Sequence, residues 1–211
     1  MKVLIITDSL GLPRPVPEIV LYEETWCHKL SEISIVHQCS LGGGTIDQLS
    51  SQLNYLKMFS PDFVIVQSGI VDCTPRALTK TENYLVNKFW LSRKLMNYFS
   101  KLIIRSLRKR GKTYTTPKVF SANVNRFLKE FGSKLYWVGI IPAVEKYENK
   151  ITGVEKNINT YNTILQEKLK MNYISTAEFS ESFLMSDFHH LNKAGHHKLF
   201  LDISGRLKLS N

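Results

Sequence analysis

A serine near the start of the chain and an aspartate–histidine pair near its end could together carry out acyl transfer. Ser9 follows the apolar run Val3-Leu-Ile-Ile6, within Thr7-Asp8-Ser9-Leu10-Gly11. Asp187 precedes His190 by three residues, so its carboxylate could hold one ring nitrogen while the other nitrogen faces a serine hydroxyl. This division of roles is that of a Ser-His-Asp triad. Taken alone, Ser9 also fits a simpler role, the N-cap of the helix that follows.

The elements that must position these residues alternate between strand and helix. Short β-branched runs predict strands, and helical patterns lie between them. The predicted strands are 3–6, 33–36, 63–66, 135–138 and, more weakly, 173–174; the predicted helices are 18–30, 46–58, 119–131, 153–170 and 193–207. The alternation predicts an α/β fold with three layers, α/β/α. Its centre is expected to be a flavodoxin-like, doubly wound parallel sheet of about five strands. Most of the strand runs are nearly all apolar, as in strands buried on both faces. Reactive residues of such a sheet lie in the loops after the strands.

Four blocks of the sequence, in this order, resemble those of the SGNH (GDSL-type) hydrolases. Thr7-Asp8-Ser9-Leu10 resembles the G-D-S-L block, and Gly42-Gly43-Gly44-Thr45 resembles the block that supplies an oxyanion-hole glycine. Gly69-Ile70-Val71-Asp72 resembles the G-x-N-D block, and Asp187-x-x-His190 resembles the D-x-x-H block. The resemblance implies the SGNH fold and a serine esterase or acyltransferase.

The resemblance also implies a role for individual residues. Ser9 is the expected nucleophile, His190 the general base and Asp187 its orienter; the D-x-x-H spacing selects His190 rather than the neighbouring His189. The oxyanion hole is expected to use the backbone N–H groups of Ser9 and Gly43.

The third block departs from the family at one position. Where the family has an asparagine whose side chain donates to the oxyanion, this chain has Val71. Loss of one oxyanion donor costs about 10² to 10³ in turnover in other serine enzymes. Either another donor serves, or backbone N–H groups suffice, or activity is low.

Two arginines follow prolines in loops after the nucleophile and third blocks: Arg14 in Leu12-Pro13-Arg14 and Arg76 in Thr74-Pro75-Arg76. The resemblance implies that the first and third strands are neighbours, which would bring both arginines to one rim. A guanidinium is a planar fork suited to a carboxylate or phosphate, so both are predicted to bind substrate. The alternative is that each arginine bonds loop carbonyls or pairs with Asp8 or Asp72.

The length and the net charge of the chain limit what can be expected of its domain organisation and partners. The 211 residues predict a single domain, 1–211, with a basic helical insertion at about 77–116. This insertion is read as a lid packed on the domain, as a homo-oligomer or partner surface, or as a peripheral contact with an anionic membrane surface. The net charge of +10 indicates an anionic partner or simply a solvated basic face, and no motif accompanies it that would predict nucleic-acid binding.

Compartment and cofactors follow from what the sequence lacks. The three cysteines, Cys27, Cys39 and Cys73, show neither disulfide nor metal spacing, and the N-terminal apolar run is too short for a signal peptide. We therefore expect a cytoplasmic protein with no cofactor and no metal.

The function predicted from the sequence is hydrolysis of an O-acyl ester, often an acetyl ester, of a carbohydrate or polysaccharide precursor. An anionic sugar would suit the two arginines. Two alternatives stay open: an O-acyltransferase that uses the same triad, and a catalytically impaired SGNH-like binding protein in polysaccharide biosynthesis, which the valine at position 71 suggests.

Overall fold

The computed structural model describes residues 1–78, 82, 84, 88, 107–108 and 110–208. Most of the basic helical insertion expected at 77–116 therefore lies outside the described residues. Within the described part, no helix is both long enough and apolar enough to cross a membrane.

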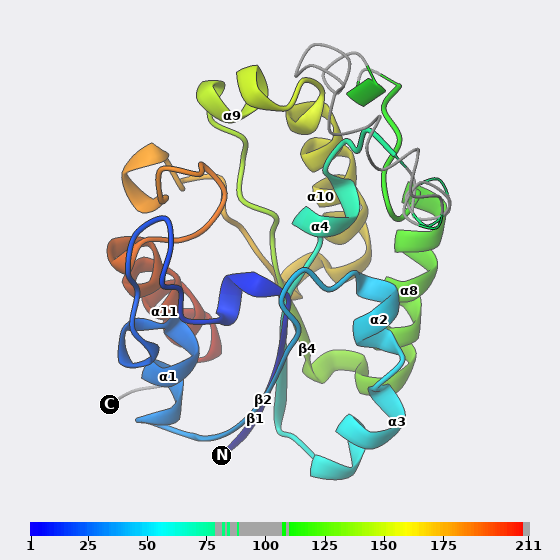
Figure 1. Cartoon of the computed structure of the whole chain (residues 1–211). Helices are drawn as coiled ribbons and strands as arrows, with labels where there is room; N and C mark the ends of the chain where they lie inside the picture. The colour runs from blue at the N-terminus through cyan, green and yellow to red at the C-terminus, as the bar shows by residue number, and fades with distance from the viewer. Residues whose placement is uncertain (79–81, 83, 85–87, 89–106, 109, 209–211) are drawn as a thin grey trace.

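A parallel sheet of five strands forms the centre of the molecule (Figure 1). The strands are β1 (Lys2–Thr7), β2 (Ile35–Ser40), β3 (Phe63–Gln67), β4 (Leu135–Val138) and β5 (Tyr173–Ile174). Their order is β2-β1-β3-β4-β5, which confirms the doubly wound prediction and the neighbouring first and third strands. Thr7 pairs with Ser40 on one side and with Gln67 on the other, so three strands end at the same edge.

Helices cover both faces of the sheet and complete the three layers. On one face lie α1 (Trp26–Ser31) and α11 (Lys193–Leu207) (Figure 1). On the other face lie α2 (Ile46–Ser50), α3 (Leu53–Leu56), α8 (Pro117–Phe131) and α10 (Val154–Leu169). Each layer has its own apolar core: Leu4 and Ile6 face the α8 and α10 side, and Val3 and Ile5 face α11. The alternation of strand side chains between two faces explains why β1 is apolar throughout.

Two short helices lie at the carboxyl end of the sheet, where the loops converge. They are α4 (Ile70–Cys73), directly after β3, and α9 (Glu145–Lys150), in the connection after β4 (Figure 1). The described part of the chain also contains short 3-10 turns: Ser9–Gly11, Tyr22–Glu24, Lys57–Phe59, Gly132–Lys134, Lys170–Asn172 and Glu181–Phe183.

The predicted helices at 18–30 and 46–58 are shorter in the structure. In place of the first, the α-helix begins only at Trp26 and ends at Ser31, because the backbone of Val20 pairs with Arg14 in an antiparallel bridge and Thr25 caps α1 by accepting from the His28 amide. The second divides into α2, α3 and a 3-10 turn. At its break, the Ser50 and Ser51 hydroxyls donate to carbonyls three residues earlier, a competition that bends helices.

The second strand also differs from its prediction. It begins at Ile35 rather than residue 33, because the Ile33 amide still donates to Leu30 O and closes the turn after α1. As an edge strand it is half exposed, with Ile35 61% exposed, so burial on both faces does not hold for it.

Candidate active site

Ser9 lies at the carboxyl end of β1, on a turn that fixes its direction. The Asp8 amide donates to Gln67 O on β3, and the Asp8 carboxylate accepts from the Leu10 amide at 3.0 Å. Asp8, not Ser9, is therefore the N-cap of the turn Ser9–Gly11, and the Ser9 hydroxyl is left for another partner. Only glycine fits at Gly11, where a Cβ would stand 2.4 Å from Thr7 Oγ1.

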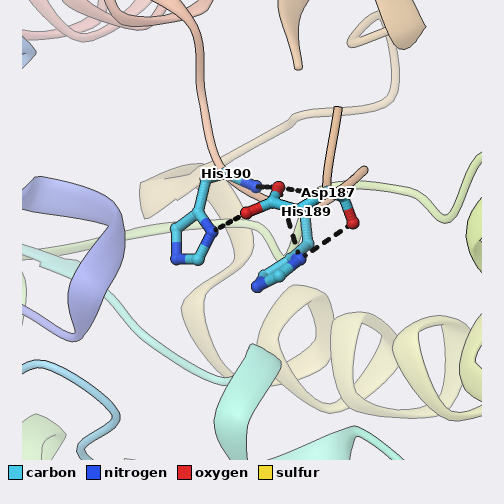
Figure 2. A group of neighbouring side chains, drawn as sticks. All are labelled: Asp187, His189 and His190. Carbon is cyan, nitrogen blue, oxygen red and sulfur yellow. Dashed lines mark hydrogen bonds and ion pairs between the residues drawn. The ribbon is translucent and has the colours of Figure 1, made fainter. Parts of the chain in front are cut away.

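The partner of Ser9 is His190, and behind it lies Asp187. Ser9 Oγ is 3.0 Å from His190 Nε2, and His190 Nδ1 is 2.6 Å from Asp187 Oδ2. The other carboxylate oxygen, Oδ1, accepts from the His190 amide at 3.1 Å (Figure 2). The structure thus brings the three residues into one hydrogen-bonded chain, in which Ser9 and His190 are 181 positions apart in sequence.

The loop that carries this pair is held by its own backbone. The Met185 amide donates to His190 O, and Leu184 pairs with Leu191 in an antiparallel bridge, so residues 185–190 form a closed loop. Immediately after it, Asn192 caps α11 by accepting from the Gly195 amide. His190 is only 6% exposed. Although burial alone would raise the pKa of Asp187, the hydrogen bond from His190 and the neighbouring imidazoles hold that pKa well below its usual range.

His189 lies next to these three residues, although the sequence favoured His190 rather than His189 as the base. Its Nδ1 lies 3.2 Å from Asp187 O, and its ring stacks on Tyr147 of α9 at 5.4 Å and 14°. Burial, with the nearby His190 imidazole, lowers the pKa of His189 to about 4, so its ring is neutral at pH 7. The ligand-type atoms of Asp187, His189 and His190 lie within 4.8 Å of one another, a grouping that the Asp187 hydrogen bonds already explain.

The side of Ser9 where the oxyanion hole is expected is less complete. Gly43 lies in an exposed loop after β2 with a φ of +68°, a conformation that favours glycine. The Val71 side chain lies beside the Ser9 cavity, where it offers no donor. Asp72 accepts from the Ile46 amide at 3.0 Å and from the Thr115 hydroxyl, so the aspartate of the third block anchors the helix that follows the glycine loop.

A second buried carboxylate lies under this side of the site. Asp8 is fully buried, and burial raises its pKa from 3.8 to about 7, with the Leu10 amide opposing the shift and Asp72 adding to it. Desolvation dominates because a charged carboxylate loses its hydration there.

The cavity next to Ser9 has a volume of about 180 Å³. Its lining combines apolar, aromatic and cationic side chains: Ser9, Ile70, Val71, Thr74, Arg76, Tyr147, Lys150, Ile151 and His189. Neither Tyr147 nor Lys150 was among the sequence-predicted residues. Their position in the loop after β4, at the carboxyl edge of the sheet, is the signal that could have found them.

Of the two predicted substrate-binding arginines, only Arg76 lines this cavity. Arg14 lines a separate groove with Pro13, Pro15 and residues 19–22. Both arginines also bond backbone carbonyls, as in the alternative interpretation. Arg14 Nε donates to Val16 O at 3.2 Å, and Arg76 Nη2 donates to Val71 O in α4 at 3.3 Å.

Solved structures with a similar architecture include lipases and esterases. A lipase/acylhydrolase from Enterococcus faecalis superposes with a TM-score of 0.67 at 15% identity, covering 99% of this chain and 97% of that chain. A GDSL-like lipase from Bacteroides thetaiotaomicron gives a TM-score of 0.56 at 10% identity, covering 99% of this chain and 87% of its own. The chain has the SGNH hydrolase fold. An acetyl xylan esterase, AlAXEase, shares this SGNH fold with a TM-score of 0.57 at 15% identity, covering 97% of this chain and 98% of that chain. No protein-family model matches the sequence, and no curated protein does.

Proposed function

We propose that this protein is a serine-dependent ester hydrolase whose nucleophile is Ser9. The observation that carries the proposal is the continuous chain from Ser9 Oγ through His190 to Asp187 Oδ2. Such a chain lets a neutral imidazole accept the serine proton as the hydroxyl attacks an ester carbonyl. The carboxylate holds the ring with its Nδ1 protonated and stabilises the imidazolium that forms.

In the first half-reaction, a bond forms between Ser9 Oγ and the acyl carbon, and the Ser9 proton passes to His190 Nε2. The tetrahedral intermediate then collapses, the alcohol leaves with that proton, and an acyl-enzyme remains. Water, activated by the same imidazole, attacks the acyl-enzyme and releases the acid. If an acceptor alcohol replaced water, the same steps would give an O-acyltransferase.

The developing oxyanion needs donors opposite His190. We assign this role to the backbone N–H groups of Ser9 and Gly43, since Val71 cannot supply the side-chain donor found in the family. Fewer aimed donors predict a slower enzyme than one with an asparagine at this position.

For the substrate we favour an O-acyl ester of a carbohydrate or polysaccharide precursor, with acetyl as the acyl group. Two observations support this choice: the cavity beside Ser9 is small, and an acetyl xylan esterase has the same fold.

Val71 favours a second candidate, a binding protein that holds such a glycan without turning it over. The two candidates are separated by reaction of the protein with a fluorophosphonate probe, combined with hydrolysis of 4-nitrophenyl acetate. The enzyme should be labelled at Ser9 and release 4-nitrophenol.

Ser9→Ala should abolish both the labelling and the hydrolysis, whereas Ser31→Ala, at an exposed serine of α1, should change neither. Hydrolysis by Ser9→Ala at the parent rate would remove Ser9 from the mechanism. A parent protein that neither labels nor hydrolyses, but binds acetylated glycans, would establish the binding protein.

A further inference from the structure

The cavity beside Ser9 contains two cationic side chains that ester hydrolysis itself does not require. Arg76 follows α4, and Lys150 is the last residue of α9. Among the residues that the structure describes, no carboxylate lies within ion-pair distance of either one. Both α4, which Arg76 follows, and α9, which ends with Lys150, lie at the carboxyl end of the sheet (Figure 1). The cavity is therefore positive next to the nucleophile.

The Arg76 guanidinium is already oriented. Its carbon lies 4.5 Å from the centroid of the Tyr114 ring, and its Nη2 donates to Val71 O. Its Nε is buried and has no hydrogen-bond partner in the described part of the chain. A buried donor without a partner costs free energy, and an acceptor on a ligand would remove this cost by accepting its hydrogen bond. Because the side chain is held in place, less entropy is lost when it binds.

Lys150 supplies a second, more mobile charge at the rim. It is exposed at the end of α9, with its Nζ 6.0 Å from the centroid of Phe188 in the triad loop. Lys146, one turn earlier on α9, pairs instead with Glu181 at 2.5 Å. Of these two lysines, Lys150 is thus the one whose charge is available to a ligand.

Resting on the proposed hydrolysis, we propose that Arg76 and Lys150 form a carboxylate-binding subsite beside Ser9, so that the substrate is an O-acylated acidic sugar. The arginine would bind the carboxylate through directed N–H groups, and the lysine would add a charge-assisted bond. The apolar side chains of Ile70, Val71 and Ile151 would pack against the rest of the ligand. Anchored in this way, the ester carbonyl would be aligned with Ser9 Oγ.

The test compares two matched esters, an O-acetylated methyl glucopyranosiduronate and the methyl glucopyranoside acetylated at the same position. Release of acetate gives kcat/KM for each. A charge-assisted hydrogen bond is worth about a tenfold to hundredfold change, so the parent should prefer the acidic ester by at least about tenfold.

The variants Lys150→Gln and Arg76→Lys should each lower the ratio of acidic to neutral kcat/KM several-fold. Arg76→Lys keeps the charge but loses the fork, so its effect isolates directed bonding. Lys146→Gln, the control on the same helix, should leave the ratio unchanged.

The outcomes of this test separate the subsite from the proposed function. Equal kcat/KM for the two esters in a parent that still depends on Ser9 would overturn the subsite and leave the hydrolase intact. A ratio that falls equally in Lys146→Gln and Lys150→Gln would also overturn it, since general surface charge would then explain the preference.

If the parent hydrolyses neither ester, calorimetric titration of the acidic ester into Ser9→Ala still decides. Binding that is stronger than for the neutral ester, and that weakens in Ser9→Ala/Lys150→Gln, would establish the subsite without the hydrolase. Equal binding of both esters would refute it.

Discussion

On one side of Ser9 a hydrogen-bonded chain runs through His190 to Asp187, whereas on the other side the Gly43 loop and Val71 bring no side-chain donor. The first side is built from one loop, in which the base and its orienter are three residues apart. The second side needs two loops, after β2 and β3, to meet. A single loop is enough to place the base and its orienter. The position of the oxyanion side depends instead on the residues packed beneath the two loops.

What lies beneath the oxyanion side is a pair of buried carboxylates. Asp72 bonds the first amide of α2, and Asp8 bonds the amide after Ser9. Both groups are fully buried. The two sides also differ in electrostatics: the pKa of Asp187 is held low by hydrogen bonds and imidazoles, while burial raises the pKa of Asp8 to about 7. The surroundings of Asp187 therefore stabilise its charged form, whereas the surroundings of Asp8 stabilise its neutral form.

The largest expected effect comes from Asp187→Asn, which removes the carboxylate bonded to His190 Nδ1. The amide keeps an oxygen that can accept from backbone amides but no longer holds the productive tautomer of His190, so kcat on 4-nitrophenyl acetate should fall by about 10³ to 10⁴. Asp202→Asn, which alters a surface ion pair with Lys198 on α11, is the matched control and should retain activity. A fall of less than tenfold in a folded Asp187→Asn protein would show that the triad side does not limit turnover.

The next effect concerns stability, and it tests the buried carboxyl group of Asp8 under the oxyanion side. Because the pKa of Asp8 is raised from 3.8 to about 7, the folded protein binds a proton here more tightly than the unfolded chain does. The stabilisation is complete below about pH 4 and is lost as pH rises through about 7, a change of up to about 4 kcal/mol in the free energy of unfolding.

Asp8→Asn cannot ionise, so its stability relative to the parent should increase from pH 4.5 to pH 8. Urea unfolding at both values measures this difference. Asp47→Asn, at an exposed position in the first turn of α2, should show no such change. A difference between Asp8→Asn and parent that stays constant with pH would mean that Asp8 is not held neutral by burial.

The smallest expected effect comes from adding the missing donor with Val71→Asn. An aimed amide N–H should stabilise the oxyanion, and turnover should stay at the parent level or rise, by about tenfold to hundredfold at most. Val71→Ala provides the control, since it opens space without adding a donor. If folded Val71→Asn protein turned over more slowly than Val71→Ala, the valine would be shaping the pocket rather than leaving it incomplete.

The sequence predicted the three-layer fold because the strands and helices rest on local features, whereas the adjacency of β1 and β3 was implied by the resemblance to the SGNH hydrolases. Apolar runs such as Val3 to Ile6 have the right length for buried strands, and short helical segments between them force parallel crossovers. The D-x-x-H spacing likewise fits within one loop, so it could be read without knowing the fold. Helix boundaries were predicted less well at 18–30 and 46–58, where side-chain hydroxyls and a backbone bridge compete with the helix.

Taken by itself, the sequence predicted that Ser9, Asp187 and His190 would meet, and its resemblance to the SGNH hydrolases marked Val71 as a position without a side-chain donor. Only the tertiary structure decided which side chains share the Ser9 cavity. It placed Arg76 there and Arg14 in another groove, and it brought Tyr147 and Lys150 of α9 to the site. The physical reason is that cavity walls come from loops distant in sequence, whose directions depend on how helices pack on the sheet. The residue types in the loops determine which functional groups are available, and the packing of the helices determines which of those groups lie beside Ser9.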